Sequence, residues 1–179
     1  MSELPRSPDR RVVEYERGTS PDELARALRE VEVVEQLDRT FSLRQVLYNQ
    51  EVRELMPRVD LEPITFRTGP AAIQPSQAEE LGAIGNAMQE MIDENPDELF
   101  LIEGHTDTVG GEVMNLALSD RRAESVALAL TEYFGIPPEN MVTQGYGERF
   151  LKYPIAGDVR ENRRAAVRRI TPLIRSAQR

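Results

Sequence analysis

The chain has 179 residues, of which 40% are hydrophobic and 30% charged, enough for the core of one domain with an extension. No stretch of 18 or more apolar residues occurs, so no segment is predicted to cross a membrane, and the absence of cysteine excludes disulfides and thiolate chemistry. The formal net charge of −9 argues against a nucleic-acid-binding protein, because nucleic acids select basic surfaces.

Charge is divided unevenly along the chain. Residues 57–140 contain four basic and 16 acidic residues, whereas residues 141–179 contain nine basic and three acidic ones. The basic residues near the C-terminus fall largely in a segment with the pattern of a strand. We therefore expect them to pair with the acidic half of the same chain, and no nucleic-acid partner is predicted.

Residues 1–56 are predicted to form an N-terminal extension that is partly helical and partly flexible. The stretch "RVVEYE" is at most a short edge strand. Ser20 is predicted to cap a helix, with Pro21 at its first position and Glu23 completing a capping box. The continuation "VEVVEQL" fits a helix or a strand. Ser42 is predicted to cap a second short helix that a proline ends. We expect this extension to pack on the main domain or on a partner outside the sequence.

Residues 57–175 are predicted to form the main domain. It begins with a short strand at residues 63–66, and Ser76 then caps a helix that ends at Asn95. One face of this helix is expected to be buried, because apolar residues recur at helical spacing. They are Leu81, Ile84, Met88 and Met91. The run "LFLI" that follows is apolar on both faces, as in a central, covered strand.

A long helix is predicted to begin after Ser119 and to end at Gly135, which suits a left-handed C-terminal cap. Its inner face is formed by Ala123, Val126, Ala127, Leu130 and Phe134. The segments "NMVTQGYG" and "RRAAVRRI" indicate two further strands, the second ending at Pro172. The order β-α-β-α-β-β predicts an α+β sandwich, in which a small mixed four-stranded sheet has helices packed on one face.

Asp107 and Arg122 are the candidate binding residues. Asp107 follows the buried strand in "GHTDTVGG", and ligands bind outside the carboxyl ends of strands in sheets of this kind. Arg122 would stand in the first turn of the helix capped by Ser119, where the helix dipole disfavours a cation. Either the two residues pair with each other, or they form a pocket in which Arg122 binds a ligand carboxylate and Asp107 an ammonium group.

No enzyme is predicted. The single histidine, His105, stands two residues before Asp107 and could in principle serve as a base or a metal ligand. No second histidine or cysteine exists, no carboxylates have metal-ligand spacing, and no serine has the context of a nucleophile elbow. We therefore predict no metal and no cofactor. His105 is expected to be a half-buried strand residue whose ring hydrogen-bonds the backbone.

Residues 60–170 carry a specific combination of motifs, "IEGHTDTVGGEVMNLALSDRRAESVALAL" followed by "GI", "QGYGE" and "ENRRAAVRRI". The combination resembles the OmpA-like peptidoglycan-binding domain, the C-terminal domain of outer-membrane protein A and of related lipoproteins and flagellar-stator proteins. The resemblance implies non-catalytic binding of peptidoglycan through the diaminopimelate group of its stem peptide, which anchors the cell envelope to the wall. It also implies a place in the periplasm, associated with the outer membrane, and a membrane tether outside this sequence.

The same resemblance implies the residues of the site. Asp107 corresponds to the aspartate that binds the ammonium group of diaminopimelate, and Arg122 to the arginine that binds its carboxylate. The other residues on pocket positions are Thr106, Asn115, Arg163 and Asn162. Two departures from the family bear on ligand binding. Gly69 stands where some members have an asparagine, and the loop before Asn162 differs from the commoner one.

Two other functions stay open at this point. The fold could serve as a protein–protein interaction module in the envelope, with residues 20–56 as the docking element. It could also belong to a hydrolase of the wall, although the lack of a convincing nucleophile or metal set argues against this.

Overall fold

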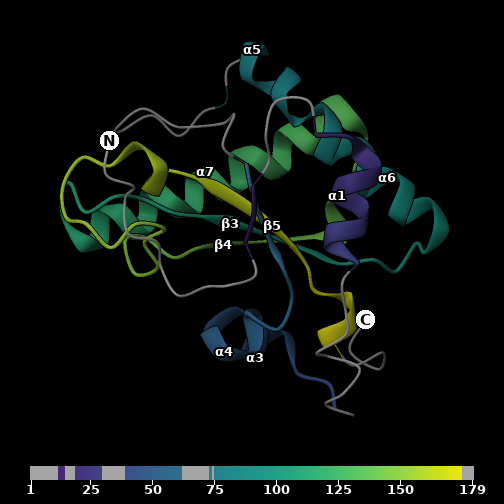
Figure 1. Cartoon of the computed structure of the whole chain (residues 1–179), viewed down its shortest axis with the longest axis horizontal. Coiled ribbons are helices and arrows are strands. Elements are labelled where there is room, and N and C mark those ends of the chain that lie inside the picture. Colours follow the sequence, from purple (N-terminus) through teal and green to yellow (C-terminus); the bar gives the residue numbers. More distant parts are fainter. Residues whose placement is uncertain (1–11, 15–18, 30–38, 62–72, 74, 175–179) are drawn as a thin grey trace.

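A mixed β-sheet lies at the centre of the fold (Figure 1). The computed structural model describes residues 12–14, 19–29, 39–61, 73 and 75–174. The strands are β1 (Val12–Glu14), β2 (Arg58–Asp60), β3 (Phe100–Gly104), β4 (Met141–Gly145) and β5 (Ala165–Arg169). Their order across the sheet is β1-β2-β5-β3-β4; β3 and β4 are parallel, and β5 is antiparallel to both β2 and β3. The predicted α+β class with a mixed sheet is confirmed.

The strands agree with the prediction except at the start of the main domain. β3, β4 and β5 coincide with predicted segments, and β1 is the short edge strand expected in "RVVEYE". The strand predicted at residues 63–66 lies outside the described residues. The neighbour of β5 on that side is β2, which pairs Val59 with Val167 and Asp60 with Ala166. β1 then adds a fifth strand by pairing parallel with β2.

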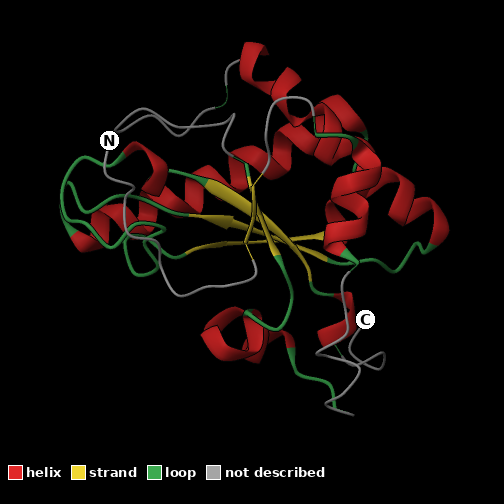
Figure 2. Ribbon diagram, viewed as in Figure 1, coloured by secondary structure: helices red, strands yellow, loops and turns green. Residues whose placement is uncertain are grey.

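Helices cover both faces of the sheet (Figure 2). On one side lie α1 (Pro21–Leu28), α5 (Pro75–Ala78), α6 (Gly82–Glu94) and α7 (Glu112–Phe134), and on the other α3 (Leu43–Tyr48) and α4 (Gln50–Arg53). Single 3-10 turns are η1 (Glu79–Leu81), η2 (Pro138–Asn140), η3 (Arg160–Asn162) and η4 (Thr171–Leu173). The helices of the main domain therefore share one face, as predicted, while two helices of the extension cover the opposite face.

The capping box predicted at Ser20 and the cap predicted at Ser42 are both confirmed. The Glu23 amide donates to the Ser20 hydroxyl, and the Ser20 amide donates to the Glu23 carboxylate. Ser42 and Gln45 exchange the same two hydrogen bonds at the start of α3. Each such cap stabilises its helix by about 1 kcal/mol. The ambiguous stretch at residues 31–37 lies outside the described residues.

The start predicted for the long helix α7 is wrong. Gly111, with φ −81° and ψ 147°, precedes its first residue, and Ser119 lies in the helix interior. Residues 112–118 contain no glycine or proline and are mostly good helix formers, so the helix runs through them. The Ser119 hydroxyl donates to the Leu116 carbonyl at 2.8 Å, a bond that accommodates serine within a helix. Arg122 is therefore not in a first turn, and the helix-dipole argument for its role fails.

The helix predicted after Ser76 has the expected end and buried face but a different start. Ser76 lies within α5, which begins at Pro75 and continues through η1 into α6. The C-cap of α6 is Asn95, as predicted. The four residues expected on its inner face are buried: Leu81, Ile84, Met88 and Met91. Gly135 likewise ends α7 in the predicted left-handed conformation, with φ 69°.

Two hydrophobic cores enclose the sheet, because side chains alternate along β3. Phe100 and Ile102 pack in the core with α1, α6 and α7, whereas Leu101 packs in the core with α3 and α4. The second core consists of Phe41, Val46, Val52, Met56, Leu101, Ile170, Leu173 and Ile174. Burying an aliphatic side chain of this size stabilises a fold by about 1.5–3 kcal/mol. The described part of the extension therefore stabilises the main domain.

Helix α7 crosses the ends of β3 and β4 at close range. A Cβ atom on Gly104 would lie 1.9 Å from the Ser119 carbonyl oxygen, and one on Gly145 would lie 2.3 Å from the Asp120 amide nitrogen. Only glycine fits such contacts between backbones. The Gly145 amide also donates to the Asp120 carboxylate at 2.6 Å. These contacts hold the middle of α7, where Arg122 lies, against the carboxyl ends of the strands.

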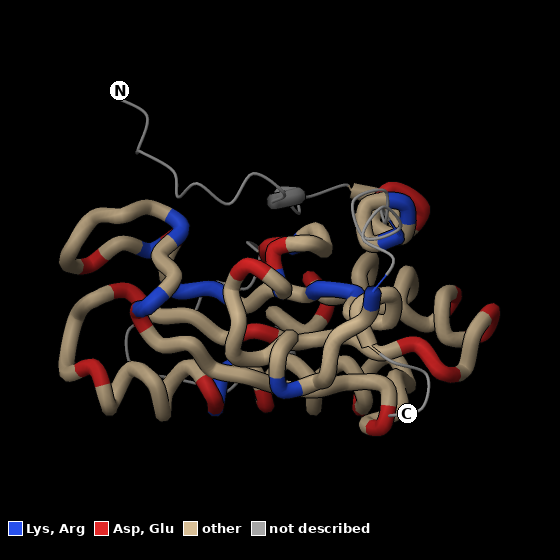
Figure 3. Tube along the Cα trace, turned by 90° about the horizontal axis from the view of Figure 1, so that it is seen from below, with Lys and Arg blue, Asp and Glu red and all other residues tan. Residues whose placement is uncertain are grey.

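The basic residues of β5 pair with carboxylates of the same chain, as predicted. Arg168 donates to Glu103 at 2.5 Å, and Arg169 donates to Glu98 at 2.7 Å. In Figure 3, basic positions near the middle of the molecule have acidic positions beside them. Both arginines of β5 are thus neutralised by carboxylates from the acidic half of the chain.

Candidate functional site

Asp107 lies in the loop between β3 and α7, at the carboxyl end of the strand, as predicted. Its side chain is buried, and carboxylate oxygen Oδ1 accepts a hydrogen bond from the Val109 amide at 3.0 Å. Asn115, in the first turn of α7, donates to the backbone carbonyls of Asp107 at 3.3 Å and Val109 at 3.0 Å. Asn115 therefore shapes the loop that presents the Asp107 carboxylate.

Arg163 forms an ion pair with Asp107. Its Nη1 donates to the carboxylate oxygen Oδ2 of Asp107 at 2.6 Å. The same nitrogen donates to the carboxylate of Asp158, an exposed residue in the loop before β5. Burial lowers the pKa of the Arg163 guanidinium, but the hydrogen bonds to Asp107 and Asp158 raise that pKa above its usual value. Arg163 therefore remains a cation between two carboxylates.

Arg122 is fully buried near this ion pair. Its Nη1 donates to the His105 carbonyl at 3.1 Å. Burial and then the charge of Arg163 lower the pKa of Arg122 to about 10, while the charge of Asp107 acts in the opposite direction. The three side chains thus share one electrostatic environment, although they come from the exit of β3, from α7 and from the loop before β5. We call Asp107, Arg122, Arg163 and Asp158 the site cluster.

Thr106 and Asn162 make different contacts around the site cluster. The Thr106 amide donates to the Gly147 carbonyl at 2.9 Å, while its buried hydroxyl has no hydrogen-bond partner among the described residues. The Asn162 side chain is buried and bonds both the amide and the carbonyl of Tyr153, each at 2.9 Å. Asn162 thus braces the loop before β5. Gly69, which stands where some family members have an asparagine, lies outside the described residues.

The site cluster has the chemistry to bind a zwitterion. An ionised carboxylate offers about four lone-pair positions, and the bonds described for Asp107 use two of them, so the carboxylate can accept a further cation. Guanidinium groups such as those of Arg122 and Arg163 bind carboxylates through charge-assisted hydrogen bonds. Among the described residues, no three side chains of the types that ligate metals come together.

A comparison of the sequence with models of known protein families identifies the family of this chain. The OmpA family model matches residues 65–168, more than half of the chain. The chain belongs to the OmpA family. This membership confirms the resemblance found in the motifs.

Several known proteins are similar to this OmpA-family chain. The probable lipoprotein YiaD of Escherichia coli is 32% identical over 107 residues, which are 60% of this chain and 45% of that protein. The outer-membrane lipoprotein YfiB of Pseudomonas aeruginosa is 42% identical over 71 residues, 37% of this chain and 40% of that protein. The chain therefore spans less than half the length of these curated relatives. No helix in the described part of the chain is long and apolar enough to cross a membrane.

Among solved structures, the C-terminal domain of MotB from Helicobacter pylori has the same fold. It aligns with a TM-score of 0.50 and 20% identity, over 59% of this chain and 82% of that domain. At this identity, the likeness concerns the fold alone.

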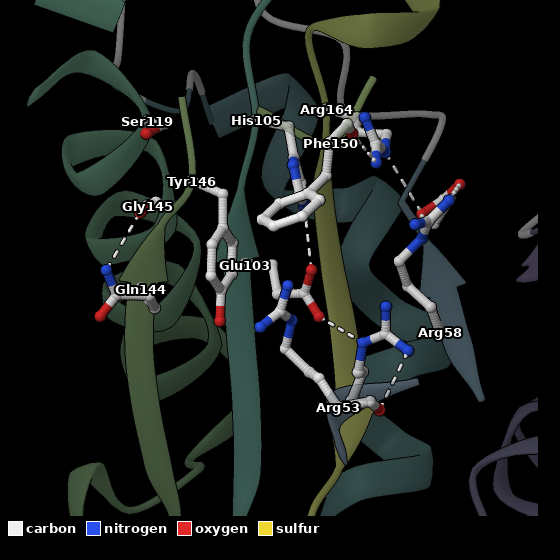
Figure 4. Close-up of polar contacts among 12 residues, drawn as sticks. Arg53, Arg58, Glu103, His105, Ser119, Gln144, Gly145, Tyr146, Phe150 and Arg164 are labelled. Carbon is white, nitrogen blue, oxygen red and sulfur yellow. Dashed lines mark hydrogen bonds and ion pairs between the residues drawn. The ribbon is translucent and has the colours of Figure 1, made fainter. Parts of the chain in front are cut away.

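The prediction for His105 is wrong in two respects. His105 is fully buried rather than half-buried, and its ring Nε2 hydrogen-bonds the Glu103 carboxylate at 2.9 Å rather than the backbone (Figure 4). Burial and the charge of Arg164 lower the pKa of His105 to about 3, although the bond to Glu103 raises it. Desolvation raises the pKa of the buried Glu103 carboxyl, but the charge of Arg168 outweighs it and holds that pKa well below its usual value. The ring is therefore neutral at pH 7, with its proton assigned to Nε2.

A second group of charges surrounds this pair on the face of the sheet that α3 and α4 cover. Arg168 donates to Glu103 at 2.5 Å and to the Met56 carbonyl at 2.8 Å, and the Arg53 guanidinium lies 4.2 Å from the centre of the Tyr146 ring. Figure 4 shows Arg53 and His105 on opposite sides of the Glu103 carboxylate. We call Glu103, His105, Arg168 and Arg53 the sheet cluster. Strand alternation from Leu101 to Glu103 was the only sequence signal for it.

Sequence reasoning also missed Asp158. It stands in the loop "IAGDV", which departs from the family's commoner loop, and no motif marks it. Its relation to Arg163 depends on how that loop folds back towards β3, which spacing alone does not predict.

Proposed function

We propose that this chain binds peptidoglycan without catalysis, through the diaminopimelate group of the stem peptide. The far end of that group carries an ammonium and a carboxylate on one carbon. The observation that supports the proposal is the buried Asp107 carboxylate beside the guanidinium groups of Arg122 and Arg163, at the carboxyl end of β3. Membership of the OmpA family and the motif resemblance to its peptidoglycan-binding domain support the same ligand.

Each residue has a distinct role in this proposal. Asp107 accepts the ligand ammonium, and Arg122 and Arg163 bind the carboxylate. The Thr106 hydroxyl, which adjoins Asp107 in the chain, supplies a neutral hydrogen bond. Asn115 acts as a positioning residue through its bonds to the backbone of the Asp107 loop. We expect Asn162 to act in the same indirect way, through the loop before β5.

The expected affinity of one site is modest. Each charge-assisted hydrogen bond contributes about 1.5–3 kcal/mol, and the loss of free motion on association offsets a large part of that gain. A wall polymer carries many identical stem peptides, so a protein held near it rebinds before it escapes. We therefore expect firm retention on intact sacculi and weak binding of soluble fragments.

The proposal places the chain in the periplasm, next to the wall and the outer membrane. Similarity to an outer-membrane lipoprotein supports this location. The alternative role as a docking module is less well supported, because Leu24, Leu28, Val46 and Val52 of the extension are buried within the fold and Tyr48 is its one exposed large apolar side chain among the described residues.

Co-sedimentation with diaminopimelate-containing sacculi tests the proposal. The chain should pellet with sacculi, and Asp107→Asn should abolish most of the pelleting because it removes the negative charge that pairs with the ammonium group while keeping the side-chain shape. Arg122→Ala should have the same effect, and Arg121→Ala should not. Arg121 is the matched control, since it is the adjacent arginine and is exposed.

Two results would contradict the proposal. Equal pelleting of a folded Asp107→Asn variant and the unaltered chain would refute the site. Release of soluble fragments from the sacculi would indicate hydrolysis rather than binding. Circular dichroism of each variant separates loss of binding from loss of folding, which matters most for the buried Arg122.

A further inference from the structure

The loop between β4 and β5 holds Asp158 against the site. Gly157 has a positive φ of 101°, and its amide donates to the Thr108 hydroxyl at 2.6 Å. Thr108 directly follows Asp107, so this bond joins the tip of one loop to the other. Asn162, near the end of the same loop, holds it through two bonds to the backbone of Tyr153, so the segment with Asp158 is closed between them. The position of Asp158 is therefore determined by contacts other than its own ion pair.

The guanidinium of Arg163 is shared between a buried and an exposed carboxylate. Its Nη1 donates to Asp107 at 2.6 Å and also to Asp158. The side chain of Asp107 is 3% exposed and that of Arg163 is 12% exposed, whereas that of Asp158 is 73% exposed. Asp158 is thus the partner of Arg163 that meets the solvent, from which a ligand would arrive.

We infer that Asp158 occupies the place on Arg163 that the carboxylate of a ligand takes, so that it is an internal competitor and a specificity-determining residue of the site. This inference rests on the proposed function. A ligand ammonium need not displace Arg163, because the Asp107 carboxylate has lone pairs beyond the two used by Val109 and Arg163. A ligand carboxylate, in contrast, needs the guanidinium that Asp158 already contacts.

The competition also gives the site a preference among ligands. A ligand that carries an ammonium group alone does not compete with Asp158, and the ion pair between Asp158 and Arg163 is kept. A ligand that carries both groups must displace Asp158, and it regains the lost ion pair with its own carboxylate. Removal of the Asp158 charge should therefore favour only the second kind of ligand.

The test is an NMR titration of Asp158→Asn with two soluble muropeptide tripeptides. One contains diaminopimelate, and the other contains lysine, which has the side-chain ammonium but lacks the carboxylate beside it. We expect Asp158→Asn to bind the diaminopimelate tripeptide about two- to fivefold more tightly than the unaltered chain, the range that fits an exposed ion pair. No gain is expected for the lysine tripeptide, whether or not its binding is strong enough to measure.

Glu139→Gln serves as the control for the change in net charge. Glu139 is exposed in η2, which precedes β4 at the opposite end of that strand from the site. Its substitution should leave the affinity for both tripeptides unchanged. Circular dichroism should show that both variants are folded, as expected for exposed positions.

Unchanged or weaker binding of the diaminopimelate tripeptide by Asp158→Asn would overturn the inference. Unchanged binding would mean that Asp158 does not compete, and weaker binding would mean that it contacts the ligand ammonium. An equal gain for the lysine tripeptide would also overturn it. The proposed function would survive each of these results if the unaltered chain binds the diaminopimelate tripeptide and Asp107→Asn does not. If the unaltered chain does not bind it, both the proposed function and this inference are refuted.

Discussion

The site cluster and the sheet cluster are built from the same kinds of residue, yet only one of them has a member that reaches the solvent. Asp158 of the site cluster is exposed and contacts Arg163, whereas all four residues of the sheet cluster are buried. Arg168 there is held by Glu103 and by backbone carbonyls at the end of α4. Arginine and carboxylate pairs thus do not by themselves indicate a binding site, and solvent access at Asp158 is what distinguishes the site cluster from the sheet cluster.

The two clusters also differ in what they do for the fold. The sheet cluster joins the extension to the main domain, since Arg168 bonds the carbonyls of Arg53 and Met56 while Tyr146 donates to the Leu47 carbonyl at 2.9 Å. The site cluster joins helix α7 to the loops that follow β3 and precede β5. Substitutions in the sheet cluster should therefore change stability, and substitutions in the site cluster should change binding.

The largest effect on stability is expected for Glu103→Gln. The substitution removes the negative charge that faces Arg168 and Arg53, so buried cations lose their counter-charge. Breaking a buried pair of this kind costs about 3–5 kcal/mol. Urea unfolding followed by circular dichroism measures the loss, and sacculus binding by the folded fraction should be retained.

Glu94→Gln is the matched control for that substitution. Glu94 pairs with Arg29 at 2.7 Å, but the two side chains are 63% and 39% exposed. An exposed pair contributes about 0–1 kcal/mol, so this variant should be nearly as stable as the unaltered chain. Similar losses in both variants would show that the sheet cluster is no more important to stability than a surface pair.

A smaller effect is expected from pH, through His105. Its folded-state pKa of about 3 lies below the ordinary value of 6.5, because of burial and the nearby charges of Arg164 and Arg58, against the opposing effect of Glu103. The unfolded chain therefore binds the proton more readily, and stability falls as pH drops below about 6.5. The slope should approach about 1.4 kcal/mol per pH unit between pH 6 and 5, before most carboxylates titrate.

The contribution of His105 to the pH dependence can be measured separately, because no other histidine of the chain titrates in this range. Free energies of unfolding, measured in urea at several values from pH 7 to 5, should show the slope in the unaltered chain. His105→Gln should remove it, whatever its effect on stability at pH 7. A slope that persists in His105→Gln would show that another group titrates in this range.

Local patterns in the sequence predicted most of the fold. The capping box at Ser20, the cap at Ser42 and the glycine at the end of α7 were predicted correctly, because a cap depends on a few adjacent residues. The start of α7 was predicted incorrectly. Serine is a common helix cap, but Ser119 lies within a helix because the residues before it already favour helix formation. A side chain that suits a cap does not show that the helix begins there.

One of the two reasons for choosing the candidate site residues is corrected by the structure. The position of Asp107 at the end of β3 followed from the strand pattern, whereas Arg122 was chosen both from the motif resemblance and for a first-turn position that it does not have. The ion pair between Asp107 and Arg163, 56 residues apart, depends on the antiparallel pairing of β5 with β3. Such contacts follow from tertiary structure, so residue spacing could not reveal them, nor the role of Asp158.

The most direct test of the central claim is a titration of the isotope-labelled chain with the diaminopimelate tripeptide, in which each backbone amide is followed by NMR. We predict shifts at the amides of Thr108 and Arg163 that Asp107→Asn abolishes, and no shifts at Arg53 and Arg168 of the sheet cluster. Shifts at Arg53 and Arg168 with none at Thr108 and Arg163, or shifts that persist in Asp107→Asn, would contradict the account.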